Sequence, residues 1–337
     1  MRHFRLAFLG FGNVGRALGR LLLLKKSELE TKYQISYTVT GIATGRHGIA
    51  INPAGLDLLE MVEAETIDRF SVTERPRDMV DFLRRCGADV LFENTPVNYE
   101  SGQPAIDHLR TALELGMHAI TANKGPVVHA YRELTELAAS KNKKFYFESA
   151  VMDGAPIFSL FREALPGANL FSFRGILNST TNMILTLMED GESFDRAVQY
   201  CQDIGIAETD PSGDIDGWDA AVKVAALVTV LMGVPIKPHQ IERQGIRQIT
   251  QADVVKAKST NMRWKLVCSA SLSGGIIQTC VKPEMITSDS PLYNIRGTTS
   301  IVQFETDVLG SLSVIESNPG PHTTAYGLLA DFLNAVN

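Results

Sequence analysis

The residues most able to do chemistry lie in the acidic stretch that ends at Lys223, where Asp214, Asp216 and Asp219 precede the lysine. If a helix runs from Asp216 onward, steps of three and four residues make Asp216, Asp219 and Lys223 neighbours on one face. The apolar run 224–232 follows at once. The predicted helix therefore enters a core, and its charged start lies at the mouth of a site. A lysine held among carboxylates in this way can exchange a proton with a substrate.

The same stretch also has a purely structural interpretation. Acids near the start of a helix are favoured by the helix dipole and as caps, and an acid–lysine pair four residues apart is common on exposed helices. These residues alone leave the two interpretations equally open. The beginning of the chain favours the chemical one.

A glycine-rich turn follows the first predicted strand, 4–9, and precedes a helix-like apolar run. The first glycine of such a turn permits the tight bend, the second lets the backbone approach a pyrophosphate, and the third lets the helix pack closely on the strand. The phosphates then meet the helix N-terminus. This context predicts a dinucleotide site. Its residues are Gly10, Gly12, Asn13, Val14 and Gly15.

The end of the second predicted strand, 33–42, is the place that contacts the adenine ribose. A carboxylate there favours NAD, whereas an arginine accommodates the 2′-phosphate of NADP. This chain has Ala43-Thr-Gly-Arg46 and no acid at the tip. We therefore expect a preference for NADP, with NAD as the alternative and Arg46 as the phosphate partner. An ordinary surface arginine is the competing interpretation.

Two further predicted strands, 89–93 and 118–121, belong to the same alternation of strand and helix. In an open parallel sheet, ligands bind beyond the carboxyl ends of the strands. Asn94 and Thr95 follow one of these strands, and Lys124 follows the other. We expect all three residues at the cofactor, and Lys124 in a turn that also meets the substrate. A surface lysine is the alternative at that position.

Composition excludes several classes of protein. The 337 residues are 45% hydrophobic with a net charge of −6. They contain no apolar run long enough for a membrane, no signal-like start and no basic patch for nucleic acid. Neither the histidines nor the cysteines have metal spacing, and the cysteines lack disulfide spacing, as is typical of a reduced cytoplasmic protein. We expect a cytoplasmic protein of two domains without a transition-metal site.

Several segments, taken in order, resemble the homoserine dehydrogenase family and cover almost the whole chain. They are the nucleotide turn at 10–18, the segment 46–58, the segments 122–127 and 147–156, the strand-to-helix segment 175–185, and the acidic stretch 205–223. Together they are far more specific than a lone glycine turn.

The resemblance implies an α/β architecture of two domains. A Rossmann-type dinucleotide-binding domain would span 1–150 and include the returning C-terminal helix, 322–337. A mixed α+β domain for substrate binding and dimerisation would span 151–321, and the protein would be a homodimer. Nothing would remain for a regulatory domain, so we expect a short, monofunctional form without feedback control through such a domain.

The implied activity is the NAD(P)-dependent interconversion of L-homoserine and L-aspartate 4-semialdehyde, a step in amino-acid biosynthesis towards threonine and methionine. Lys223 would be the proton shuttle at the substrate oxygen, helped by Lys124. Asp219 would hold the substrate and orient Lys223. Glu208 would bind the substrate ammonium, and Asp214 would support the same pocket.

The resemblance also implies residues around this centre. Thr180 would line the substrate cavity. Glu148, with the backbone oxygens of Val151 and Asp153, would match the family's site for a monovalent cation, Na⁺ or K⁺. That site would only stabilise the hinge between the domains, so its loss should be mild. Asp216 has no implied chemistry and is predicted to be a helix cap.

Some positions depart from the family pattern. Ser179 stands where glycine is usual, and Pro319 and Pro321 fall in a turn that is usually Gly-Ala-Gly and approaches the nicotinamide. Prolines remove backbone donors and fix dihedrals. A related hydroxy or amino acid or semialdehyde is therefore an alternative substrate. A non-catalytic nucleotide-binding protein is a further alternative, although a sensor would need no proton shuttle.

Overall fold

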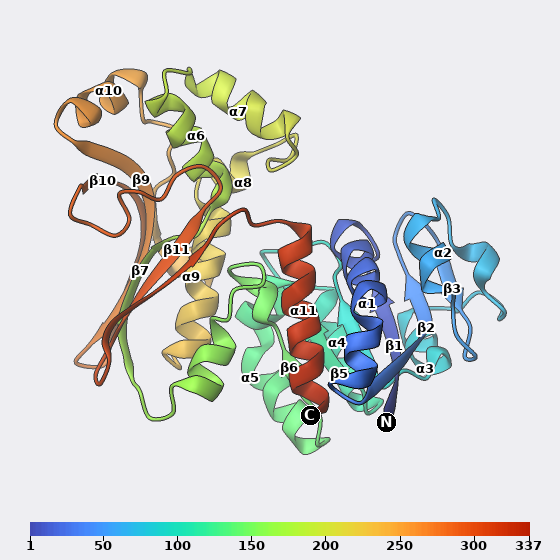
Figure 1. The fold of residues 1–337 in the computed structure, drawn as a ribbon. Helices are drawn as coiled ribbons and strands as arrows, with labels where there is room; N and C mark the ends of the chain where they lie inside the picture. The colour runs from blue at the N-terminus through green and yellow to red at the C-terminus, as the bar shows by residue number, and fades with distance from the viewer. The chain divides into compact units, whose positions relative to one another are not determined.

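The computed structural model describes residues 1–337 and divides the chain into two compact units. Unit 1 consists of Met1–Pro156 together with Gly320–Asn337, and unit 2 consists of Ile157–Pro319. Each unit contains one six-stranded sheet (Figure 1). None of the helices combines the length and the apolar character needed to cross a lipid bilayer.

The sheet of unit 1 has the strand order β3-β2-β1-β4-β5-β6. The strands are β1 (Arg2–Leu9), β2 (Ile35–Ala43), β3 (Ile49–Ile51), β4 (Val90–Glu93), β5 (His118–Thr121) and β6 (Phe145–Tyr146). Every neighbouring pair is parallel except β2 and β3. Both β4 and the second half of β1 are continuously buried, as expected of parallel strands covered on both faces. The strand order is that of a Rossmann domain, which confirms the predicted fold class.

Helices connect these strands and cover them. They are α1 (Asn13–Thr31), α2 (Leu58–Glu63), α3 (Met79–Cys86), α4 (Ala105–Glu114) and α5 (Lys124–Ser140), with 3-10 turns at Asp68–Phe70 and Glu148–Ala150. The last helix, α11 (Pro321–Val336), packs against α1 and the turn at Glu148–Ala150. Figure 1 shows this red helix beside the blue α1, although the two lie at opposite ends of the sequence.

Unit 2 is built on a mixed sheet of order β12-β11-β7-β9-β10-β8. Its strands are β7 (Leu170–Ile176), β8 (Glu242–Arg243), β9 (Met262–Ser273), β10 (Ile276–Thr287), β11 (Ser300–Thr306) and β12 (Gly310–Glu316). Its helices are α6 (Ser179–Glu189), α7 (Phe194–Asp203), α8 (Ser212–Ile215), α9 (Trp218–Leu231) and α10 (Gln251–Ser259), with a π-helical turn at Leu160–Ala164 and a 3-10 turn at Pro238–Gln240. All strand pairs are antiparallel except β8 and β10. The predicted mixed α+β fold is confirmed.

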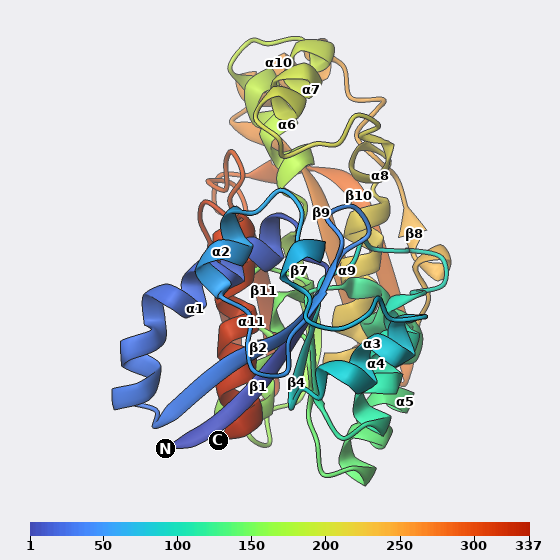
Figure 2. The ribbon, with the colours of Figure 1, turned by 90° about the vertical axis from the view of Figure 1, so that its right-hand side faces the viewer.

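The alternation of side chains along β9 and its neighbours separates two faces of this sheet. Cys268 is buried, and α9 packs on this part of the sheet (Figure 2). Ser269, the next residue, points the other way and is half-buried, beside its register partner Cys280. One stretch of the sheet is therefore covered by α9 on one side and open on the other.

The return of α11 makes the core of unit 1 depend on both ends of the chain. Phe332 is fully buried and makes edge contacts with Phe4 and Phe92, at ring-centroid distances of 5.9 and 6.1 Å. Aromatic pairs in this geometry stabilise a core beyond the area that they bury. The C-terminal helix is thus part of the hydrophobic core of unit 1.

We predict that Phe332→Ala lowers the free energy of unfolding of unit 1 by about 3–5 kcal/mol, because the cavity removes both ring contacts and the buried area. Tyr326→Ala, at a 57% exposed position on the same helix, is the control and should change it by about 0.5 kcal/mol or less. Urea titrations followed by circular dichroism measure both values. Equal midpoints for the two variants would contradict the prediction.

Candidate functional site

The predicted acid–lysine helix begins later than expected. α8 ends at Ile215, α9 begins at Trp218, and Gly217 between them has a φ of +80°, in the left-handed region that glycine adopts readily. Asp216 therefore does not continue the face of Asp219. Asp216 does not cap the start of α9, because its carboxylate forms an ion pair with Arg247 at 2.9 Å and no side chain caps that helix. It is instead the cap residue at the C-terminal end of α8.

Asp219 and Lys223 form the contact that their spacing predicts. Lys223 Nζ lies 3.2 Å from Asp219 Oδ2, and the two side chains are 14% and 11% exposed. The ammonium also donates a hydrogen bond to the carbonyl of Leu177. Solvent and salt screen an ion pair at this depth less than one on the surface. The lysine is thus held by two oxygens in a fixed position.

The side-chain amide of Asn178 joins this pair to Asp214. Its Nδ2 donates to Asp214 Oδ1 at 2.6 Å and to Asp219 Oδ2 at 3.0 Å. Its Oδ1 caps α6 by accepting from the backbone N–H of Thr181 at 2.8 Å. One side chain therefore connects α6, α8 and α9. The sequence analysis assigned no role to Asn178; an asparagine before a helix start indicates a cap but not its partners.

Burial governs the electrostatics of this network. Burial, followed by the nearby charge of Asp219, raises the pKa of Asp214. Beneath Lys223, burial raises the pKa of the Cys268 thiol to about 12, so this thiol stays neutral. The network thus contains one ammonium and two carboxylates, and one of these carboxylates is more readily protonated than an ordinary aspartate.

The other two predicted substrate residues occupy different environments. Thr180 is buried in the first turn of α6 and donates to the carbonyl of Ile206 at 3.0 Å. Glu208 is exposed in the loop between α7 and α8, where its backbone carbonyl accepts from Gln202 at 3.2 Å. No hydrogen bond or ion pair joins the Glu208 carboxylate to the Asn178 network. The structure therefore brings together Asp214, Asp219 and Lys223, and leaves Glu208 outside.

In unit 1, the glycine turn has the geometry that a nucleotide requires. Gly10 has a φ of +86°, and a Cβ there would lie 2.3 Å from the carbonyl oxygen of Asn94. A Cβ on Gly15 would lie 2.7 Å from the carbonyl oxygen of Gly10, whereas one on Gly12 would meet nothing within 4 Å. Gly12 also leaves α1 without a side-chain cap. The N–H groups of its first turn, from Asn13 to Gly15, therefore have no capping side chain, as suits the binding of an anion.

Polar groups gather beyond the carboxyl ends of β4 and β5. Both polar atoms of the Asn94 side chain are buried without a hydrogen-bond partner, as expected of a group that awaits a ligand. Thr95 is held by Glu93, which accepts from its backbone N–H at 3.0 Å and from the Thr121 hydroxyl at 2.8 Å. Glu93 is fully buried and links the two strand ends. The sequence indicated only that an acid ends an apolar strand.

We predicted that Lys124 lies in a turn, but it is the first residue of α5. Asn123 precedes it as the cap, with Oδ1 accepting from the backbone N–H of Gly125 at 3.0 Å. Asn123 Nδ2 in turn donates to the carbonyl of Thr95 at 3.2 Å. The cap therefore ties the start of α5 to the segment after β4.

Arg46 is exposed in the loop between β2 and β3. The loop is closed by a backbone hydrogen bond of 3.0 Å from Thr44 to Gly48, and the Thr44 hydroxyl accepts from the backbone N–H of His47 at 2.6 Å. The Arg46 guanidinium has no partner in the protein. It lies after the strand end that the sequence analysis associated with the adenine ribose.

The predicted cation residues form one segment held by α11. Glu148 and Val151 are buried, and Asp153 has a φ of +35°. The backbone N–H of Glu148 donates to Asp331 at 2.7 Å. No group of three or more histidine, cysteine or acidic side chains could hold a metal anywhere in the chain, so a site here would rely on backbone oxygens.

The proline-bearing turn has a local explanation. Pro321 is the first residue of α11, a position where the missing N–H costs nothing and the fixed φ suits a helix. Gly320 before it donates its backbone N–H to the Thr323 hydroxyl at 2.9 Å. The departure at Pro321 is therefore compatible with the helix start that the turn precedes.

Two family models match most of unit 1 and most of unit 2. The model of the homoserine dehydrogenase NAD-binding domain matches residues 10–148, and the model of the homoserine dehydrogenase domain matches residues 156–333. An NAD(+)-dependent homoserine dehydrogenase from Pseudomonas canavaninivorans is 34% identical over 99% of this chain and 96% of its own length.

Solved structures agree with these matches. A putative homoserine dehydrogenase from Archaeoglobus fulgidus superposes with a TM-score of 0.85 at 28% identity and covers 98% of both chains. A mutant homoserine dehydrogenase from a hyperthermophilic archaeon, in complex with NADPH, gives a TM-score of 0.82 at 30% identity, over 99% of this chain and 98% of its own.

We predict that Gly10→Ala and Gly12→Ala separate folding from nucleotide binding. The first substitution forces a Cβ into the Asn94 carbonyl at a positive φ, so it should lower the melting temperature. The second meets no protein atom, so it should keep the melting temperature and weaken nicotinamide nucleotide binding by roughly tenfold or more, because a methyl group then blocks the pyrophosphate. Differential scanning fluorimetry and calorimetric titration measure the two effects. Unchanged nucleotide affinity in Gly12→Ala would contradict the prediction.

Proposed function

This chain belongs to the homoserine dehydrogenase family, and on that premise we propose that it interconverts L-homoserine and L-aspartate 4-semialdehyde with a nicotinamide cofactor. The observation that carries the proposal is the half-buried Lys223, held 3.2 Å from Asp219 in a network that Asn178 joins to Asp214. The residues of the glycine turn, with the unpartnered Asn94 amide, fit a dinucleotide.

The reaction moves a hydride and a proton, and the protein handles the proton. The nicotinamide supplies or accepts the hydride at the substrate carbon that bears the oxygen. In the reducing direction, the Lys223 ammonium donates its proton to this oxygen as negative charge develops there; in the oxidising direction, the neutral amine takes the proton from the hydroxyl. Asp219 and the Leu177 carbonyl orient the ammonium.

A zwitterionic substrate explains why the proposed residues carry both signs of charge. We assign Glu208 to the substrate ammonium, with Asp214 and Thr180 supporting the same pocket and Lys124 assisting at the substrate oxygen or carboxylate. The raised pKa of Asp214 fits a supporting role, because its protonated form can donate a hydrogen bond. A different hydroxy acid or semialdehyde is the second candidate, favoured by the altered turn around Pro319.

For the cofactor, we propose a preference for NADP. The support is the unpartnered Arg46 guanidinium after β2, together with the absence of an acid at that strand end. The remaining nucleotide contacts are assigned to the glycine turn, Asn94 and Thr95. Relatives include an NAD(+)-dependent enzyme and one solved with NADPH, so both cofactors occur in the family.

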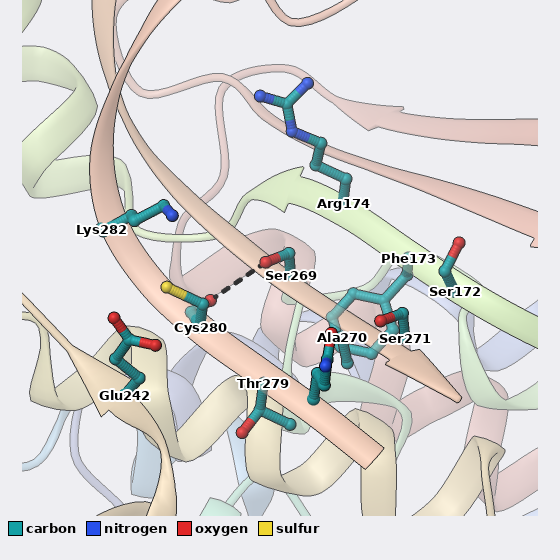
Figure 3. A pocket seen from close by; sticks show the side chains of 11 residues that line it. Ser172, Phe173, Arg174, Glu242, Ser269, Ala270, Ser271, Thr279, Cys280 and Lys282 are labelled. Carbon is teal, nitrogen blue, oxygen red and sulfur yellow. Dashed lines mark hydrogen bonds between the residues drawn. The ribbon is translucent and has the colours of Figure 1, made fainter. Parts of the chain in front are cut away.

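We also propose a homodimer that forms through the open face of the unit 2 sheet. Figure 3 shows Arg174, Ser269, Cys280 and Lys282 on β7, β9 and β10, where they line a pocket. The volume of this pocket is about 620 Å³. Opposite charges line it, since Lys282 and Glu242 are both present. Such a face can pair with a second copy of itself. Sedimentation velocity tests this proposal, and we expect a species of twice the chain mass. If only a species of 36.9 kDa, the mass of one chain, is found, the dimer is contradicted.

A monovalent cation, Na⁺ or K⁺, is proposed at Glu148 and the backbone oxygens of Val151 and Asp153. The buried carboxylate supplies the charge, and the hydrogen bonds to α11 keep the segment in place. The ion would have a structural role. Replacing Na⁺ and K⁺ in the buffer by choline should lower the melting temperature slightly. An unchanged melting curve would contradict the proposed cation site. The cytoplasm, the expected location, contains both ions.

We predict that the purified chain reduces NADP with L-homoserine and that Lys223→Met lowers kcat by roughly a hundredfold or more, because the variant lacks the group that we assign to the proton transfer. Nucleotide affinity should not change, since Lys223 lies in unit 2. Lys256→Met, on the exposed side of α10, is the control. Absorbance at the nicotinamide band measures turnover with homoserine and a panel of hydroxy acids.

The outcomes separate the candidates. Turnover of another hydroxy acid but not homoserine would select the second substrate. Nucleotide binding without turnover of any substrate would select a binding protein. Wild-type turnover in Lys223→Met would remove the proton-shuttle assignment.

We predict that Arg46→Ala raises KM for NADP roughly tenfold and leaves KM for NAD nearly unchanged, because only NADP carries the 2′-phosphate. Lys26→Ala, at an exposed position on α1, should change neither. Initial rates with both cofactors provide the comparison. Equal effects on the two cofactors would show that Arg46 is an ordinary surface residue.

A further inference from the structure

Lys265 on β9 is a buried charged group that the proposed reaction does not use. It is 0% exposed, and its ammonium donates to Asn182 Oδ1 at 3.0 Å and to the carbonyl of Ile295 at 2.6 Å. Burial lowers its pKa to about 8. A charge at this depth is costly even when hydrogen-bonded, and an apolar side chain is often the more stable occupant of such a position. The contacts of Lys265 therefore point to a role beyond stability.

The partner of Lys265 belongs to a line of buried polar side chains along α6 and its cap. Asn178, Asn182, Thr186 and Glu189 follow one another at steps of four, four and three, so they share one face of the helix. Asn178 is the cap whose amide holds Asp214 and Asp219. The line therefore begins at the proposed catalytic network.

Asn182 is fixed from both ends of its amide. Its Nδ2 donates to the carbonyls of Gly297 and Thr299, at 2.9 and 3.2 Å, while Oδ1 accepts from Lys265. Thr186 adds to the same contact, because its hydroxyl accepts from the backbone N–H of Gly297 at 3.0 Å. The segment 295–299 and β9 are thus hydrogen-bonded to α6 one turn after its cap.

The C-terminal end of α6, at Glu189, carries the other charges that face Lys265. Glu189 lies 3.6 Å from Arg263 and 3.2 Å from Arg296, and Arg296 also pairs with Asp190 at 2.6 Å. These pairs fasten the C-terminal end of α6. Lys265 and Asn182 are the contact nearest to the cap at the other end.

We propose that Lys265 is a positioning residue for the reaction: through Asn182 it sets the height and rotation of α6, and thereby the place of the Asn178 amide against Asp214 and Asp219. The inference rests on the proposed function, in which Asp219 orients Lys223. Because a helix moves as a rigid rod over one turn, a shift at Asn182 is passed directly to Asn178. Small displacements of a catalytic group cost large factors in rate.

The test uses Lys265→Met, which keeps the length of the side chain and removes its donors. We expect kcat for homoserine oxidation to fall roughly tenfold, while the dissociation constant for the nucleotide, which unit 1 binds, stays unchanged. Asn182→Ala should cause a similar loss, and the double variant should lose no more than either single variant, because the two residues act through one contact. Lys258→Met is the matched control: this exposed lysine donates to the carbonyl of Glu189 at 3.0 Å, at the opposite end of α6, and its loss should leave kcat unchanged.

A pH profile adds a readout that a merely structural role would not move. The Lys265 ammonium loses its proton as pH rises through about 8, and its hydrogen bond to Asn182 weakens. The ratio of wild-type to Lys265→Met kcat should therefore fall across this range. Glu189, Arg263 and Arg296 are present in both proteins, so their charges cancel in the ratio.

Three results would overturn the inference. They are a Lys265→Met kcat equal to that of the wild type, losses that multiply in the double variant, and a rate ratio that does not change with pH. If Lys265→Met does not fold, Asn182→Ala alone decides, and a wild-type kcat in that variant contradicts the proposal. Homoserine turnover by the wild type with unaffected variants contradicts the positioning role alone, whereas no wild-type turnover contradicts the proposed function and this inference together.

Discussion

A single amide nitrogen holds two carboxylates, the buried Asp219 and the partly buried Asp214, and the geometry of unit 2 around its acid–lysine network depends on that constraint. The negative charges of Asp214 and Asp219 repel each other, because both carboxylates bond to the same amide nitrogen. The Asn178 donor and the Lys223 ammonium must therefore both be in place to stabilise the two carboxylates. Three helices have to meet at this point. The left-handed Gly217 turns the chain between α8 and α9 so that Asp214 and Asp219 approach the amide from separate helices.

Unit 1 is under a different constraint, because a nucleotide site needs free backbone donors at the edge of a rigid core. The close approach of Gly10 to the Asn94 carbonyl brings the glycine turn against the end of β4. Glu93 ties β4 to β5 through the Thr121 hydroxyl. The core beneath is completed by α11, whose Phe332 packs on β1 and β4. The donors can remain open to a ligand because hydrophobic packing elsewhere supplies the stability.

Features that depend on neighbouring residues were predictable. The strand at 118–121 has the bounds of β5, the helix after the glycine turn is α1, and the Asp219–Lys223 pair follows from helical spacing. The predicted helix face that Asp216 would share with Asp219 is wrong because the same spacing was extended through Gly217, which interrupts the helix. The bridge made by Asn178 could not be predicted, since it joins residues 36 and 41 positions apart in the chain.

The sequence by itself determined the strand, glycine turn and helix that begin the dinucleotide fold and the residue types of the proposed site, because hydrophobic periodicity and glycine spacing are local properties of the chain. The fold of unit 2 was implied only by the resemblance to a known family. Only the tertiary structure decided which acids share a donor, which lysine is buried, and which groups have shifted pKa values. Lys265 illustrates the reason: nothing near it in the sequence distinguishes it from a surface lysine, yet its partners come from α6 and the segment after β10. Desolvation and long-range hydrogen bonds arise only when distant segments pack together, and they set the charge and position of each group.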